Sequence, residues 1–153
     1  MAYDSGEARR ELLDVIGDAT DRLALALAAI GAAYEQLDDA TADRLEEALF
    51  RPVQLAYGRS RRTFNAFASR YGLPLRDFEP ALPGGVASQG VKVFVERAVD
   101  AVADADDILS ELQDSMRPVE VGDPELRAGL AEVRELLGAI RAQAREFVRV
   151  LGR

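Results

Sequence analysis

Residues 124–151 read PELRAGLAEVRELLGAIRAQAREFVRVL, and apolar residues recur in this stretch at alternating intervals of four and three. This spacing is typical of an α-helix that buries one face against other helices. The start is also favourable, because Asp123 can cap free N–H groups and Pro124 suits the first helical position, which needs no N–H. We therefore expect a helix over 124–151. Its buried positions are predicted to be Leu126, Leu130, Val133, Leu137, Ile140, Ala144, Phe147 and Leu151.

Two other segments, residues 5–37 and 88–116, show the same alternation and predict two more helices. Asp4 and Glu7 have the spacing of a capping box for the first, and Ser88 is the expected N-cap of the second. No position of these three apolar stripes is polar, so we expect an interior without reactive groups. The predicted buried positions are Leu12, Ile16, Ala19, Leu23, Ala26, Ile30, Ala33 and Leu37 in the first, and Val91, Val95, Ala98, Val102, Ala105, Leu109, Leu112 and Met116 in the second.

The segment 42–71 is apolar on one face too, but its pattern is interrupted. After Leu45 and Leu49 the apolar register slips by one residue at Pro52, which lacks an N–H and clashes with the preceding turn of a helix. We expect either a kink there or two shorter helices that meet near Phe50 and Arg51.

The linkers constrain how these helices are arranged. Residues 38–41 and 117–122 are short, so each should join two antiparallel neighbours. The loop 72–88 is rich in proline and glycine and is long enough to cross the length of a helix, which leaves a crossover possible. The chain has 153 residues and is 48% hydrophobic, enough for one core. We predict a single all-α domain over 1–153, a four-helix bundle with left-handed, coiled-coil-like packing and a second helix kinked at Pro52.

Composition excludes several kinds of chemistry. The chain has no cysteine and no histidine, so it lacks thiolate ligands, cysteine nucleophiles and the commonest general base. Without histidine the usual di-iron site of helical bundles is impossible, and no Asp-x-Asp-x-Asp-Gly loop suggests calcium. We expect no enzyme activity, metal or cofactor. The N-terminus does not resemble a secretory signal and no apolar run reaches the roughly 18 residues of a membrane span, so a cytoplasmic location is predicted.

The positive charge of the chain is concentrated in the second segment. Residues 48–76 contain six arginines and no Asp or Glu, in a protein whose net charge is −8. At about 100° per residue, Arg51, Arg59, Arg62 and Arg70 share an arc of roughly 100° opposite the apolar face, and Arg61 lies on the other flank. Guanidinium groups bind carboxylates and phosphates, and an aromatic ring can stack on a base. The candidate binding residues are therefore Arg51, Arg59, Arg61, Arg62, Arg70, Tyr57 and Lys92.

The alternative is that these arginines meet carboxylates of the same chain. The segment 88–116 carries six acids for this purpose, although its register places most of them outward: Glu96, Asp100, Asp104, Asp107, Glu111 and Asp114. A second candidate, GGVASQGVK at 84–92, lacks the strand and the lysine position of a phosphate-binding loop. At most Lys92 could hold an anion at a helix N-terminus, and a plain linker is the simpler interpretation.

These observations favour a non-enzymatic interaction or regulatory module whose arginine face binds an acidic protein partner. The alternative is a binding protein for a phosphorylated small molecule or a nucleic acid, although the net negative charge disfavours nucleic acid. Self-association stays open, and no membrane contact is expected.

Overall fold

The computed structural model describes residues 5–79, 81 and 90–151, and these residues form helices and connections without a strand. The elements are α1 (Ser5–Tyr34), α2 (Asp39–Leu45), a π-helical turn η1 (Glu46–Phe50), α3 (Arg51–Arg70), α4 (Val91–Asp114), α5 (Arg117–Val121) and α6 (Pro124–Leu151). None of these helices is long and apolar enough to cross a membrane.

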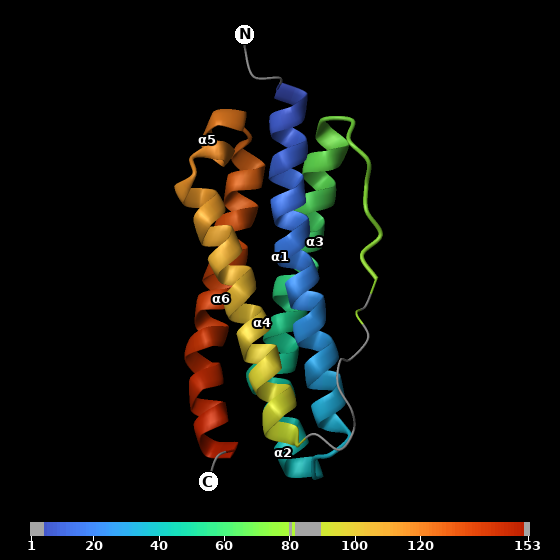
Figure 1. Ribbon diagram of the computed structural model, residues 1–153, viewed down its shortest axis with the longest axis vertical. Helices are drawn as coiled ribbons and strands as arrows, with labels where there is room; N and C mark the ends of the chain where they lie inside the picture. The colour runs from blue at the N-terminus through green and yellow to red at the C-terminus, as the bar shows by residue number, and fades with distance from the viewer. Residues whose placement is uncertain (1–4, 80, 82–89, 152–153) are drawn as a thin grey trace.

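The long helices pack side by side and neighbours run in opposite directions (Figure 1). Helix α1 packs on α3 and α4, and α6 packs on the same two helices. The antiparallel pairs α1/α3 and α4/α6 agree with the short linkers of the sequence. Consecutive helices α3 and α4 point the same way, so the connection between them returns from one end of the molecule to the other. The long loop therefore makes the crossover that the sequence left open.

The predicted apolar stripes are buried along most of their length. Leu12, Ile16, Leu23 and Ile30 have no exposed surface, and the stripe of α6 is buried from Leu126 to Ala144. Stripe residues near the helix ends are only half-buried: Leu37, Val91, Phe147 and Leu151.

One stripe position was predicted wrongly. Met116 is 52% exposed, because α4 ends at Asp114 and Met116 takes the left-handed conformation (φ 65°) that starts α5. Helix α5 itself replaces part of the expected 117–122 linker, and Gly122 (φ 74°) ends it. Only a glycine adopts that backbone angle without strain.

A π-helical turn lies where the register slips. The spacing of Leu45, Leu49 and Val53 is four and four, which would rotate the apolar stripe away from the core in a regular α-helix. In η1 the N–H of Arg51 donates to the carbonyl of Glu46, five residues back, so each residue turns less and all three side chains stay buried. Pro52 follows directly within the first turn of α3, where its missing N–H interrupts no regular α-helical bond.

The helix starts follow the sequence in part. Asp123 caps α6, since its Oδ1 accepts from the Leu126 N–H at 2.8 Å. Asp38, which was expected to be linker, caps α2 by accepting from the Thr41 N–H at 2.7 Å, so this helix starts three residues earlier than predicted. Gly90 occupies the N-cap position of α4. The proposed caps Asp4 and Ser88 lie outside the described residues.

The interior is not purely apolar, contrary to expectation. Thr20 of α1 and Ser60 of α3 are buried, and their hydroxyl oxygens lie 2.5 Å apart, while Thr20 also donates to the Ile16 carbonyl at 2.8 Å. Thr63 is buried where α3 meets Gly129 of α6. Each of these hydroxyls has a hydrogen-bond partner, so they cost little to bury.

Candidate functional site: a cleft between α3 and α6

Three of the predicted arginines line one cleft. Arg59, Arg62 and Arg70 stand on the outer face of α3, spaced so that all three point toward α6. The cleft between the two helices has a volume of about 430 Å³. Ala66 on α3 and Ala128 on α6 have small side chains and leave space between the three arginines. The other lining residues are Thr63, Ala66, Glu125 and Ala128.

Arg70 is held by two carboxylates at the start of α6. Its Nε and Nη2 donate to the two oxygens of Asp123 at 3.0 and 2.7 Å, and its Nη1 donates to Glu125 at 2.7 Å. The bond to Asp123 raises the pKa of Arg70. Burial opposes ionisation of Asp123, but the hydrogen bonds from Arg70, the Leu126 N–H and Tyr71 together hold its pKa below the usual value.

Arg59 is paired as well. The Nε of Arg59 donates to Glu132 of α6. Arg62 is exposed and has no carboxylate partner within the part of the chain that the structure describes. The carboxylates that meet this face therefore come from α6 and not from the segment 88–116, because α6 is the neighbour of α3 on this side.

The remaining predicted residues lie elsewhere. Arg51 stands at the start of α3, 71% exposed and 3.6 Å from Glu46. The Arg61 guanidinium lies 4.8 Å from the ring centroid of Tyr57, which is buried, so this ring packs in the core and is covered on one face.

Lys92 is on α4, 3.8 Å from Glu96. The structure thus brings together three of the seven candidate residues. Most of the 84–92 segment lies outside the described residues.

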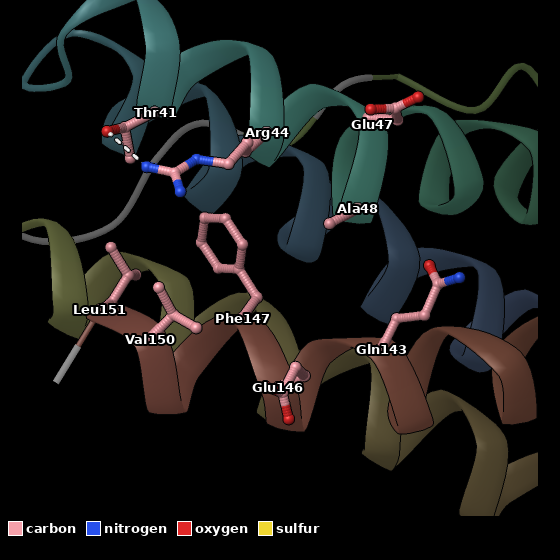
Figure 2. Close-up of a pocket in the computed structure, with 9 residues that line it drawn as sticks. All are labelled: Thr41, Arg44, Glu47, Ala48, Gln143, Glu146, Phe147, Val150 and Leu151. Carbon is pink, nitrogen blue, oxygen red and sulfur yellow. Dashed lines mark hydrogen bonds between the residues drawn. The ribbon is translucent and has the colours of Figure 1, made fainter. Parts of the chain in front are cut away.

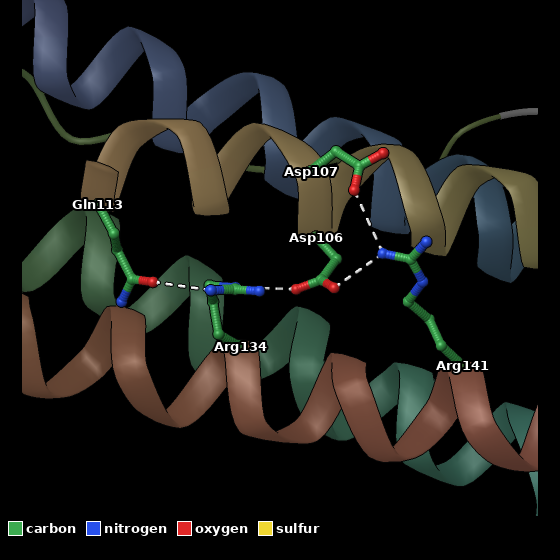
Figure 3. A network of polar contacts seen from close by, with 5 residues as sticks. All are labelled: Asp106, Asp107, Gln113, Arg134 and Arg141. Carbon is green, nitrogen blue, oxygen red and sulfur yellow. Dashed lines mark hydrogen bonds and ion pairs between the residues drawn. The ribbon is translucent and has the colours of Figure 1, made fainter. Parts of the chain in front are cut away.

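A second polar cluster joins α4 to α6 (Figure 3). Asp106 is 5% exposed, and its two oxygens accept from Arg134 Nε and Arg141 Nη1, each at 3.0 Å. Arg141 also reaches Asp107 at 3.2 Å, and Arg134 reaches Gln113 at 3.1 Å. The bond to Asp106 raises the pKa of Arg141.

Asp106 was not singled out from the sequence, although this carboxylate is buried beside the apolar stripe of α4. The signal was present, since Asp106 lies four residues after Val102 and three before Leu109 and so flanks the buried stripe. Both of its oxygens are bonded to arginines, which suits a clamp between helices better than acid–base chemistry.

A larger groove, drawn in Figure 2, lies at the opposite end of the molecule from α5 (Figure 1). It has a volume of about 700 Å³ and separates α2 and η1 from the last turns of α6. Phe147 points into it toward Arg44, while Val150 and Leu151 form an apolar wall. Its charges are mixed, since Arg44, Glu47 and Glu146 all line it, so it presents no set of like charges to a ligand.

In the described ranges, no group of three or more carboxylates is placed to hold a metal ion. Comparison of the chain with models of protein families, with curated proteins and with solved structures found no match.

Proposed function

We propose that the protein is a non-enzymatic interaction module that binds an acidic segment of a partner protein at the α3/α6 cleft. The observation that carries this proposal is Arg62, an exposed arginine without a carboxylate partner in the described residues, at the edge of a cleft that also holds Arg59 and Arg70. A carboxylate that enters the cleft would pair with Arg62, as carboxylates of Asp123, Glu125 and Glu132 already pair with Arg70 and Arg59.

The cleft favours a carboxylate over a polyanion. Arg59 and Arg70 keep 31% and 29% of their side chains exposed, so both can turn further N–H groups to a ligand. Glu125 stands at the rim, 76% exposed, and would repel a dense negative charge such as a nucleic-acid backbone. A phosphorylated small molecule at the same arginines is the second candidate, and it must compete with Glu125 for Arg70.

We infer that the four long helices act as a single four-helix bundle with coiled-coil-like packing, and that the chain bends near Pro52. A bundle of this kind would hold the α3/α6 cleft rigid and preformed. A cytoplasmic location stays a prediction.

A charge reversal with a matched control tests the site. Arg62→Glu changes a cleft residue, and Arg61→Glu makes the same change one position away on the other flank of α3. With a labelled ten-residue peptide that carries two glutamates separated by serines as probe at 50 mM salt, we expect Arg62→Glu to weaken binding at least tenfold and Arg61→Glu to weaken it only slightly. Fluorescence anisotropy measures both, and thermal melts verify folding.

Two outcomes would contradict the proposal. If both folded variants bind the peptide equally, or if the wild-type protein does not bind it, the cleft is not an acidic-peptide site. A rise in melting temperature with inorganic phosphate that Arg62→Glu abolishes would support the second candidate instead.

A further inference from the structure

The chain after α3 runs over α1 and α3, and we call the surface that it covers there, formed by Gly17, Asp21, Phe64 and Asn65, the α1/α3 groove. Residues 73–79 leave the end of α3 and run extended alongside these helices (Figure 1). The N–H of Leu73 donates to the Ala68 carbonyl at 2.8 Å, which sets the direction of departure. We call residues 73–79 the strap.

The strap is held through its backbone by one side-chain amide. Asn65 of α3 donates from Nδ2 to the Arg76 carbonyl at 3.0 Å and accepts from the Arg76 N–H at 2.9 Å. This pair of bonds grips an extended backbone as a neighbouring β-strand would. Because it uses only main-chain groups of the strap, it would hold any residue at this position equally well.

Two side chains of the strap, Arg76 and Phe78, make specific contacts with α1 and α3. Arg76 donates from Nη2 to both oxygens of Asp21 at 2.7 and 2.8 Å. Gly17 makes room for it, since a Cβ there would lie 2.8 Å from the guanidinium. The ring of Phe78 meets Phe64 edge-on, with centroids 5.2 Å apart, and the Arg76 guanidinium lies 4.4 Å from the Phe78 centroid.

The strap is bound lightly. Arg76 and Asp21 keep 42% and 48% of their side chains exposed, so their ion pair is largely solvated. Leu75, which directly precedes Arg76 in the strap, is 64% exposed. Release of the strap would uncover an aromatic ring, an acceptor for a cation and an amide that binds extended backbone, all in one groove.

We propose that the α1/α3 groove is a binding site for an extended segment of a partner protein that carries Arg-x-Phe, and that the strap occupies it in cis as a competing ligand. The occupant is defined by the groove itself. Asp21 binds the arginine side chain, for which Gly17 leaves room. Phe64 contacts the aromatic ring two residues later, and Asn65 bonds the backbone N–H and C=O of the arginine. This site is separate from the α3/α6 cleft and does not depend on the function proposed there.

A peptide with the strap's own sequence tests this inference. The release variant Arg76→Ala/Phe78→Ala removes the side-chain contacts of the strap and leaves only its backbone bonds to Asn65, without changing α1 or α3. The probe is a labelled, end-blocked heptapeptide of sequence LPLRDFE, followed by fluorescence anisotropy. We expect the release variant to bind it at least tenfold more tightly than the wild-type protein, because the competing segment has lost its arginine and phenylalanine contacts and is displaced more easily.

Control variants and a control peptide distinguish specific binding in this groove from nonspecific peptide binding. In the release background, Asn65→Ala should weaken peptide binding at least tenfold, and Asp21→Ala should weaken it by up to about fivefold because its ion pair is largely solvated. A peptide with alanine at its arginine and phenylalanine positions should not bind. If the folded release variant does not bind LPLRDFE, the strap is a connection only and the proposal is wrong.

A measurement on the wild-type chain covers the case in which the release variant fails to fold. Saturating peptide should accelerate hydrogen exchange of the Arg76 amide, whose N–H is bonded to Asn65, and an unchanged rate would overturn the proposal. Concentration-dependent dimerisation of the wild-type chain by exchange of straps would also overturn it, in favour of a second copy as the occupant.

Discussion

Replacement of Gly129 by alanine should reveal how closely α3 and α6 approach. A Cβ at this position would lie 2.5 Å from Oγ1, 2.8 Å from Cγ2 and 3.2 Å from Cβ of Thr63. Thr63 cannot easily turn away, because a β-branched side chain has few rotamers in a helix and its hydroxyl donates to the Arg59 carbonyl at 2.9 Å. The two helices must therefore separate slightly to admit the methyl group.

The expected magnitude combines two opposing effects. Overpacking of a well-packed interface costs about 1–3 kcal/mol. Alanine in place of glycine inside a helix contributes about 0.8–1.0 kcal/mol of stability. Gly138 lies on the same helix with nothing within 4 Å of its virtual Cβ, so Gly138→Ala should show the second effect alone. Gly129→Ala should then be less stable than Gly138→Ala by about 1–3 kcal/mol.

Urea denaturation of both variants measures this difference, and a double-mutant cycle assigns it. In a Thr63→Ala background the two closest atoms are gone and only the Cβ contact at 3.2 Å remains, so most of the cost of Gly129→Ala should disappear. If Gly129→Ala is as stable as Gly138→Ala, or if Thr63→Ala does not relieve its cost, the close approach of the helices is refuted.

Further predictions concern single side chains, each measured by urea denaturation. Asp123→Ala should lower the free energy of unfolding by about 2–3 kcal/mol, since it removes the cap of α6 and two bonds to Arg70; a loss below about 0.5 kcal/mol would contradict this. The folded pKa of Asp123 lies below the unfolded value of about 3.9, so its contribution to the free energy of unfolding is complete above about pH 5 and is lost as the pH falls below 4 through the folded pKa. Acid should therefore destabilise the wild-type protein more steeply than Asp123→Asn. Parallel curves of stability against pH for the two proteins would argue against this. Tyr57→Phe should leave stability unchanged or raise it by up to about 1 kcal/mol, because the hydroxyl is buried with no partner in the described residues, and a clear loss would show that the hydroxyl is bonded.

A second tyrosine has the same feature. The hydroxyl of Tyr34 is also buried without a hydrogen-bond partner in the region described, and burial, with the nearby charge of Glu46, raises its pKa to about 12. Its ring meets Phe50 of η1 edge-on, with centroids 5.8 Å apart. Packing against the π-helical turn therefore fixes this ring, and the hydroxyl contributes no bond within the described structure.

The sequence predicts the helices well because burial repeats along them. A stripe such as that of α1 alternates by four and three over eight positions, and only a helix with one buried face has this period. The slip at Pro52 was visible too. A proline excludes a regular helical turn, but a kink and a π-helical turn both satisfy that restriction, so the sequence could not choose between them.

The candidate site was less predictable, since it depends on which helices are neighbours. The arginines of α3 were recognised by their spacing, whereas their partners Glu132, Glu125 and Asp123 follow from the packing of α3 against α6. That packing is a consequence of the crossover, and a long loop permits more than one topology. The role of Asn65 was missed for the same reason, because an amide gives no sign of its partner before the strap is placed.

The parallel course of α3 and α4 also means that the molecule consists of two helical hairpins, α1 with α3 and α4 with α6, joined only by the long connection. Each hairpin alone would leave in water the apolar residues by which α1 contacts α4 and α3 contacts α6, and the other hairpin is the surface that buries them. The two halves, produced as separate polypeptides cut within that connection, should therefore reassemble on mixing. Their pairing would depend on concentration, and the ion pairs of Arg59 and Arg70 with α6 would help each half to select its complement.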